Sequence, residues 1–168
     1  MLRSHSAPRV LITSSNLVFS SASLTSAELF LPTQRQRRGR WHQSTGWAKV
    51  ADGRYEVITE REGRWYYLGT YAGVGEPRMI DPRAFISMGD KVKNAIYRET
   101  LNGADDRLSK SVGGMYGRGM LRALKIGLEY IGYNEKLADE LARSVRDRPD
   151  RHAKRRAGRR SGTGVEGR

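Results

Sequence analysis

The chain has 168 residues, of which 38% are hydrophobic and 29% are charged, and it carries a formal net charge of +13. This length suits one compact domain with tails, and the low hydrophobic share indicates that part of the chain adds nothing to a core. The lack of cysteine excludes disulfides, thiolate metal sites and cysteine nucleophiles, and no apolar run approaches the ~18 residues of a membrane span.

The positive charge is concentrated toward the two ends of the sequence. Residues 1–40 hold six Lys or Arg against one Glu, and residues 146–168 hold nine against three acids. Residues 41–145 are nearly neutral, with sixteen basic and fourteen acidic side chains. We therefore predict an α+β domain over 41–145 between disordered basic tails at 1–40 and 146–168.

The N-terminal segment is rich in serine and has no acidic residue before Glu28. Organellar transit peptides and ordinary disordered N-termini share this composition, and the sequence leaves both open. The run from Gln34 to Arg40 is interpreted as a polar basic linker. Order is expected to begin near Trp41, or at an edge strand over residues 29–31.

A strand pattern begins at Tyr55 and is interrupted by a turn at Glu62-Gly63. The aromatic and β-branched run that follows predicts the second strand of a β-hairpin over about residues 55–74. This second run is apolar on both faces, which is typical of a buried strand. Gly69 inside it indicates a bulge or the close approach of another backbone.

Capping signals and apolar stripes predict three helices, over residues 83–88, 90–101 and 135–145. The first begins after Asp81-Pro82, and the last begins after Asn134. Residues 105–114 are expected to form a polar loop.

A third strand is predicted over about residues 124–130, because Gly127 and Gly132 weaken a helix there. Its register near Gly127 is left open. The expected fold is a small antiparallel sheet, made of the hairpin and this strand, covered on one side by about three helices around one core.

The run Trp65-Tyr66-Tyr67-Leu68-Gly69-Thr70-Tyr71 resembles a motif of a fungal, basidiomycete-type domain family of unknown function, the 6697-type. Segments resembling other parts of that family follow in the same order, at residues 81–85, 91–101 and 113–134. The resemblance covers about residues 41–143 and is most specific in the aromatic run. It implies domain limits and no chemistry, because the family has no established activity or active-site residues.

Catalytic motifs are not evident in the sequence. His42 is the one histidine of the predicted domain, which is too few for the usual zinc sets, and Asp105-Asp106 lacks the spaced oxygen ligands of a calcium loop. No serine lies in a GxSxG elbow. We therefore predict no catalytic residue, no metal site and no cofactor.

Two features could hold a ligand. The glycine-rich loop Gly113–Gly119, with Arg118, could cradle a phosphate, and the aromatic hairpin could stack bases. The candidate ligand residues are Trp65, Tyr67, Tyr71, Arg64 and Arg118. A core role for the aromatic side chains is favoured, since they are the largest apolar groups available to fill a small core.

Residues 151–160 carry six basic side chains in ten positions. These are Arg151, Lys154, Arg155, Arg156, Arg159 and Arg160. Such a run suits a nucleic-acid arm or a nuclear signal bound by an import receptor, and a tail that only adds solubility is the alternative.

These features predict a non-enzymatic interaction module that binds nucleic acid or an import receptor through its basic tails, in the nucleus and not at a membrane. A mitochondrial location is the alternative indicated by the N-terminus. The alternative function is an enzyme or small-ligand-binding domain that uses the Gly113–Gly119 loop or the aromatic hairpin. The oligomeric state is not indicated.

Overall fold

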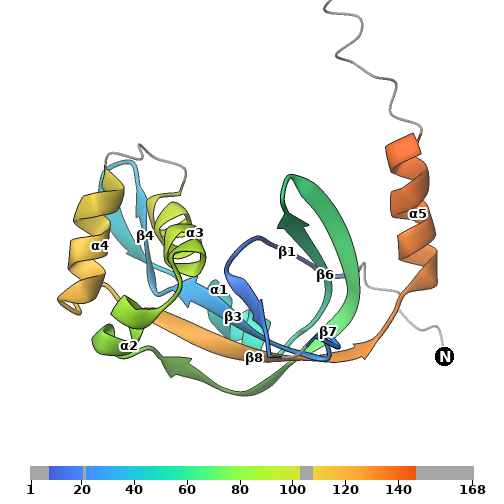
Figure 1. Ribbon diagram of the computed structural model, residues 1–168, viewed down its shortest axis with the longest axis horizontal. Helices are drawn as coiled ribbons and strands as arrows, with labels where there is room; N and C mark the ends of the chain where they lie inside the picture. The colour runs from blue at the N-terminus through green and yellow to red at the C-terminus, as the bar shows by residue number, and fades with distance from the viewer. Residues whose placement is uncertain (1–7, 21, 103–107, 147–168) are drawn as a thin grey trace, which may run out of the picture. The chain divides into compact units, whose positions relative to one another are not determined.

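The computed structural model describes residues 8–20, 22–102 and 108–146, which fall into two compact units divided between Tyr133 and Asn134 (Figure 1). The strands, all in the first unit, are β1 (Val10–Thr13), β2 (Leu17–Phe19), β3 (Ser26–Pro32), β4 (Gln34–Arg37), β5 (Arg40–Gln43), β6 (Arg54–Arg61), β7 (Arg64–Met79) and β8 (Ala123–Gly132). The helices of that unit are α1 (Gly46–Ala51), α2 (Pro82–Ser87), α3 (Asp90–Leu101) and α4 (Ser109–Gly117). The second unit contains α5 (Glu135–Arg146), which the sequence had placed in the same domain as the sheet.

The central element is a curled six-stranded sheet with the strand order β1-β6-β7-β8-β3-β2. The strand β1 pairs with β6 in parallel, and the other neighbours are antiparallel. The strands β4 and β5 form a separate two-stranded sheet. The α+β class is confirmed, whereas the small antiparallel sheet expected from the sequence is a larger, mixed one.

The prediction of a disordered tail over residues 1–40 is wrong from Val10 onward, because this stretch supplies three strands of the central sheet. Within β3, the side chains of Ala27, Leu29 and Leu31 point to the same face of the sheet. Each of these three residues is paired with an apolar residue of β8. Leu29 is fully buried. The strand β3 lies between β8 and β2, so it is not the edge strand considered from the sequence.

The predicted hairpin is confirmed as β6 and β7. Glu62 and Gly63 both have left-handed backbone angles, with φ of 52° and 75°. A two-residue turn of this kind matches the twist of the strands it joins, and glycine adopts it without steric cost.

A bulge interrupts β7 at Leu68. The register of the two strands shifts between Val57 and Ile58, which leaves Leu68 as the extra residue. The neighbouring Gly69 has a φ of 106°, and a Cβ there would lie 2.7 Å from the carbonyl oxygen of Gly132. Both features predicted for Gly69, a bulge and the close approach of another backbone, are therefore present.

The three predicted helices are confirmed as α2, α3 and α5. The Asp81 carboxylate accepts a hydrogen bond from the Arg83 backbone amide at 2.8 Å, and the Asn134 side chain accepts one from the Leu137 amide at 3.1 Å. Asn102 ends α3 in the left-handed conformation. None of the described helices has the length and apolar content of a bilayer span.

The helix α4 contradicts two predictions. Residues 105–114 were expected to form a loop, but their described part is helical from Ser109 onward. The glycine-rich segment Gly113–Gly119 was also expected to be a loop, and α4 includes it as far as Gly117. Each glycine inside a helix costs about 1 kcal/mol relative to alanine. Val112 and Tyr116, four residues apart, are both buried. Burial of a large side chain contributes about 1.5–3 kcal/mol, so these two outweigh the glycines.

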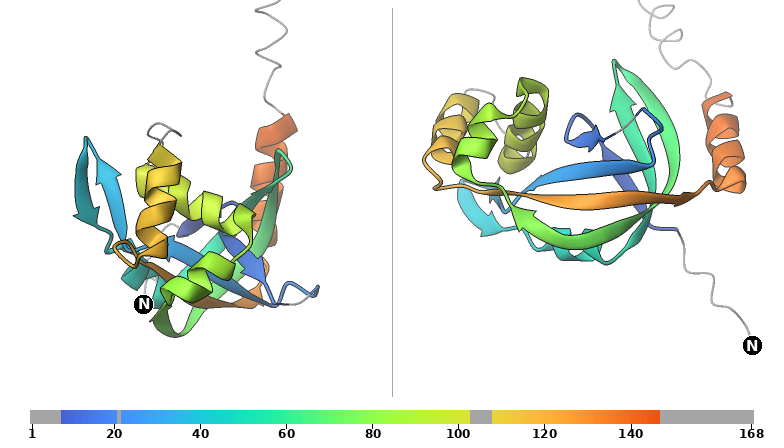
Figure 2. Two further views of the ribbon diagram at one scale, coloured as in Figure 1. Left: turned by 60° about the vertical axis from the view of Figure 1, so that its left-hand side comes forward. Right: turned by 60° about the horizontal axis from the view of Figure 1, so that its bottom comes forward.

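The described residues of the first unit form two clusters of buried side chains in place of the single core expected. One is built from β2, β3, β6, β7 and β8 with α1, and it includes Leu29, Val57 and Tyr71. The other joins α2, α3 and α4 to Phe30 and Ala123 of the sheet. Figures 1 and 2 show these three helices gathered at one end of the sheet.

The predicted strand over 124–130 is confirmed as the central strand β8. Its register at Gly127 is now defined, with Glu28 of β3 and Val74 of β7 as partners. A Cβ on Gly127 would lie 2.9 Å from the Val74 carbonyl oxygen, so the two strands approach closely there. The six basic residues predicted between 151 and 160 lie outside the described residues.

Candidate functional site

The bulge in β7 separates the three aromatic residues that the sequence offered as candidate ligand contacts. The bulge reverses the alternation of side chains, so Trp65 and Tyr67 lie on one face of the strand and Tyr71 on the other. Trp65 is 62% exposed, whereas Tyr71 is 1% exposed in the first core. The Tyr67 hydroxyl donates a hydrogen bond to Glu56 Oε2 at 2.6 Å. A core role is therefore confirmed for Tyr71 and wrong for Trp65.

The two predicted ligand arginines lie on different elements. Arg64 is exposed at the start of β7, opposite Arg61, and Arg118 is exposed at the C-terminal end of α4. The backbone amides of Gly113 and Gly114 lie in a helix interior, where amides bond to carbonyls of the preceding turn. The phosphate cradle considered for residues 113–119 is therefore not formed.

Instead, a folded cationic hairpin appears where the sequence predicted a basic linker. We call β4, β5 and their turn, residues 34–43, the basic ribbon. Arg38 and Gly39 form the turn, with left-handed φ values of 49° and 77°. The period-two alternation of glutamine and arginine in β4 was the signal in the sequence that could have identified a strand.

One face of the basic ribbon is cationic. Its register places Arg35 opposite His42 and Arg37 opposite Arg40, and directly paired residues point to the same face. The other face carries Trp41, which is 39% exposed. The left view of Figure 2 shows the ribbon standing out from the rest of the first unit.

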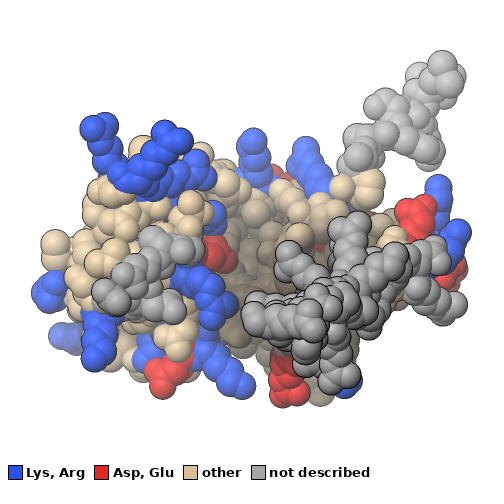
Figure 3. Space-filling model, turned by 90° about the horizontal axis from the view of Figure 1, so that it is seen from above, with Lys and Arg blue, Asp and Glu red and all other residues tan. Residues whose placement is uncertain are grey.

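Three arginines of the basic ribbon are exposed, namely Arg37, Arg38 and Arg40. None of them forms an ion pair with an acidic side chain of the described residues. Figure 3 shows lysine and arginine side chains grouped over the part of the first unit that contains β4, α3 and α4, with few acidic side chains among them.

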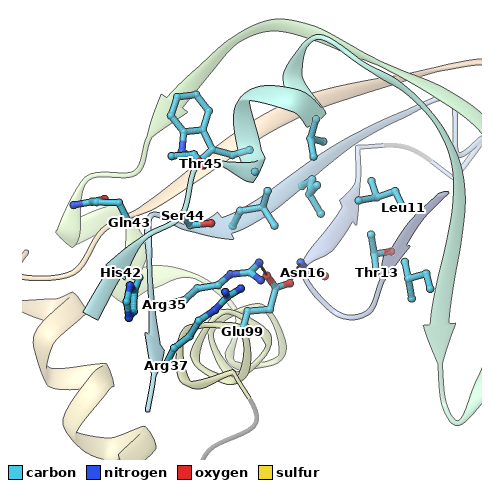
Figure 4. A pocket seen from close by; sticks show the side chains of 16 residues that line it. Leu11, Thr13, Asn16, Arg35, Arg37, His42, Gln43, Ser44, Thr45 and Glu99 are labelled. Carbon is cyan, nitrogen blue, oxygen red and sulfur yellow. Dashed lines mark hydrogen bonds and ion pairs between the residues drawn. The ribbon is translucent and has the colours of Figure 1, made fainter. Parts of the chain in front are cut away.

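The base of the basic ribbon is tied to α3 through Glu99. Arg35 Nη2 lies 2.7 Å from Glu99 Oε2, and Asn16 Nδ2 donates to Glu99 Oε1 at 2.6 Å. Asn16 also donates to the Phe30 carbonyl at 3.3 Å. Burial raises the pKa of the Glu99 carboxyl, and the Arg35 guanidinium opposes that rise. Figure 4 shows Asn16 and Arg35 approaching Glu99 from different elements.

A cavity of about 580 Å³ opens at this base, among the basic ribbon, β1, β3, α1 and α3. Its apolar wall is formed by Leu11, Ile12, Leu29, Leu31, Trp47 and Val50. Its polar lining includes Thr13, Asn16, Arg35, Arg37, His42 and Glu99. Figure 4 shows the Arg35 and Arg37 side chains extending side by side toward Glu99.

Two buried polar atoms, each in a residue that lines this cavity, have no hydrogen-bond partner within the described part of the chain. They are Thr13 Oγ1 and Arg35 Nε, and both are buried. Buried polar groups in native proteins nearly always have a partner, which can be a protein group, an ordered water molecule or a bound ligand atom. Among the described residues, these two are the buried side-chain nitrogen or oxygen atoms without a hydrogen-bond partner, and both belong to residues that line this cavity.

A second cavity, of about 490 Å³, is lined by residues that include Phe19 and Lys91. The residues predicted as ligand contacts line neither of these two cavities. Within the described ranges, no three His, Asp or Glu side chains come together as metal ligands.

Comparisons of the chain with protein-family models, with curated proteins and with solved structures find no match. The resemblance of residues 41–143 to the fungal 6697-type family stays a prediction.

Proposed function

We propose that this protein is a non-enzymatic nucleic-acid-binding module whose basic ribbon contacts the phosphate backbone. The observation that carries this proposal is the pair Arg38 and Arg40, exposed at the tip of a folded hairpin without a described acidic partner. Arginine forms charge-assisted, two-pronged hydrogen bonds to phosphate oxygens, and a two-stranded ribbon is narrow enough to enter a DNA major groove.

The fold supports this proposal by holding the cations in place. Strand pairing fixes the spacing of the arginines, and the Arg35–Glu99 ion pair anchors the base of the ribbon. A preorganised side chain loses less conformational entropy on binding than one on a flexible tail. The exposed Trp41 on the opposite face adds a surface on which an unpaired base could stack.

The C-terminal basic run is proposed as a second phosphate contact and as a nuclear import signal. Its six basic residues, between 151 and 160, suit both uses. We favour a nuclear over a mitochondrial location, because removal of a Ser-rich transit peptide would take away strands β1 and β2 of the central sheet.

Removing the tip charges tests the proposal. Two variants of the full chain are compared, Arg38→Gln/Arg40→Gln and the matched control Arg54→Gln/Arg83→Gln, whose arginines are exposed elsewhere on the first unit. Binding to labelled single-stranded and duplex oligonucleotides is followed by fluorescence anisotropy over a salt series. Each lost phosphate contact reduces the slope of log K against log salt by about 0.7–0.9, so the tip variant, which loses two contacts, should lose about 1.4–1.8.

The control variant should keep the slope of the unmodified chain. An equal loss in both variants would show that binding follows total charge and not the ribbon. Binding that is unchanged in the tip variant, or independent of salt in the unmodified chain, would contradict the proposal.

A further inference from the structure

The lining of the 580 Å³ cavity is cationic when its ion pair is taken into account. Glu99 balances the charge of Arg35, at 2.7 Å. Arg37 lines the same cavity and forms no ion pair with a described acidic side chain, and His42 lies opposite Arg35 on the basic ribbon. The balance of formal charge therefore favours an anionic group near Arg37 and His42.

The remainder of the cavity would accept an uncharged body. Trp47 and the aliphatic side chains of β1, β3 and α1 form its apolar wall. Binding sites for small molecules commonly enclose about 300–1,000 Å³. The volume of about 580 Å³ lies within this range.

The cavity lining contains more hydrogen-bond donors than a carboxylate ligand would use. Arg35, Arg37 and His42, whose side chains carry nitrogen atoms, line the cavity together with the hydroxyl-bearing residues Ser44 and Thr45. A phosphate monoester offers three terminal oxygen atoms, whereas a carboxylate offers two, and arginine recognises phosphate especially well. The donor set thus fits a phosphate attached to an apolar or planar body.

We propose that this cavity binds one nucleoside 5′-phosphate unit, with the phosphate at Arg37 and His42 and the nucleoside along the wall that contains Trp47. The unit is either a free nucleotide or the phosphorylated 5′ end of a nucleic-acid strand. The second source rests on the proposed function, because Arg37 directly precedes Arg38 and lies opposite Arg40 on the basic ribbon.

Calorimetric titration of the full chain tests the shared chemistry. The probes are each of the four nucleoside 5′-monophosphates, the matching unphosphorylated nucleosides and inorganic phosphate. At least one nucleotide should bind at least tenfold more tightly than its nucleoside and than inorganic phosphate. Arg37→Gln should weaken that binding about tenfold or more, because a charge-assisted contact to phosphate is lost.

Two further variants separate a ligand contact from a structural effect. Val50→Phe reduces the apolar part of the cavity and should also weaken nucleotide binding. Glu99→Gln removes the one acidic side chain that the described residues contribute to the cavity lining, so this variant should bind the nucleotide severalfold more tightly. A purely structural role of Glu99 would produce no such gain. Arg83→Gln is the control, and circular dichroism verifies that each variant is folded.

A second arm identifies the source of the nucleotide. Two oligonucleotides that differ only in a 5′-phosphate or a 5′-hydroxyl are compared. The site is assigned to strand ends if the unmodified chain prefers the phosphorylated strand, Val50→Phe abolishes this preference and the Arg38→Gln/Arg40→Gln variant retains it. Binding of the free nucleotide without this preference assigns it to a free nucleotide.

The proposal is overturned if no nucleotide binds and no 5′-phosphate preference is seen, even where the basic ribbon still binds nucleic acid. It is also overturned if inorganic phosphate binds as tightly as every nucleotide, or if Arg37→Gln and Val50→Phe leave nucleotide affinity unchanged. Conversely, nucleotide binding that persists when oligonucleotide binding fails removes the proposed function and keeps the cavity site.

Discussion

Glu99 is the carboxylate through which three separate parts of the chain meet. It accepts hydrogen bonds from Arg35 on the basic ribbon and from Asn16 in the turn between β1 and β2, while its own backbone belongs to α3. Its side chain keeps 31% of its surface accessible, because it faces the cavity. Glu99 therefore orients the ribbon and also reduces the positive charge of the cavity.

The pH dependence of stability should reveal this carboxylate. Burial raises the pKa of Glu99 above its ordinary value of 4.5, with Arg35 opposing the rise, so the folded protein holds the proton more tightly than the unfolded chain does. The stabilisation from Glu99 is then complete below pH 4.5 and is lost as the pH rises through the folded-state pKa. Glu99→Gln cannot titrate, so the unfolding free energy of the unmodified chain should fall relative to this variant across that window.

Urea denaturation of both proteins between about pH 4 and pH 8 measures this difference. If the unfolding free energy of the unmodified chain instead rises relative to that of Glu99→Gln as the pH increases, Arg35 lowers the pKa of Glu99 more than burial raises it.

At the scale of elements, the bulge in β7 decides which side chains can act together. Period-two alternation would place Trp65, Tyr67 and Tyr71 on one face, as the alternative of a shared aromatic ligand site, considered beside the favoured core role, required. One extra residue at Leu68 sends Tyr71 into the core and leaves Trp65 exposed. Gly69 makes this arrangement possible, since a side chain there would meet the backbone of β8.

Alanine substitutions at two glycines test the close approach at the bulge. Gly63 and Gly69 both have left-handed φ, at 75° and 106°, but a Cβ on Gly63 would have no atom within 4 Å. Gly63→Ala should cost about 1–2 kcal/mol of unfolding free energy for its backbone conformation alone. Gly69→Ala should cost about 3 kcal/mol or more, because the neighbouring strand must also shift.

Chemical denaturation of the two variants gives both values. Equal costs at the two positions would indicate that β8 does not approach Gly69 as closely as described.

Elements with strong local signals could be predicted from the sequence. The hairpin over residues 55–74 followed from its alternation and its turn, and the helices α2, α3 and α5 followed from their caps. The helix α4 was missed because its glycines disfavour a helix, and only tertiary contacts show that Val112 and Tyr116 are buried. The strands β1 to β3 were missed because serine-rich composition resembles that of a disordered segment.

The candidate site was less accessible to prediction than the fold. The sequence singled out residues 34–40 as basic, but the pairing of Arg35 with His42 and of Arg37 with Arg40 depends on a hairpin that carries few β-forming residues. The cavity also needs Asn16 and Glu99, which are far apart in the sequence and meet only in the folded chain. No local pattern contains that contact.

At the scale of the molecule, the N-terminal strands occupy both edges of the central sheet. The strand β1 pairs with β6 at one edge, and β2 pairs with β3 at the other edge. Removing residues 1–40 would therefore expose the backbone of β6 and β8 and dismantle part of the cavity. The positive charge of residues 35–40 belongs to a folded structure, which is the central claim on which both proposals rest.

Amide hydrogen exchange of the full chain, measured by mass spectrometry, tests this claim most directly. Peptides covering β3, residues 26–32, should exchange at least about a thousandfold more slowly than an unstructured peptide and similarly to peptides from β8, since both strands are interior to one sheet. Exchange over residues 10–43 at the rate of an unstructured chain, with β8 still protected, would contradict the account.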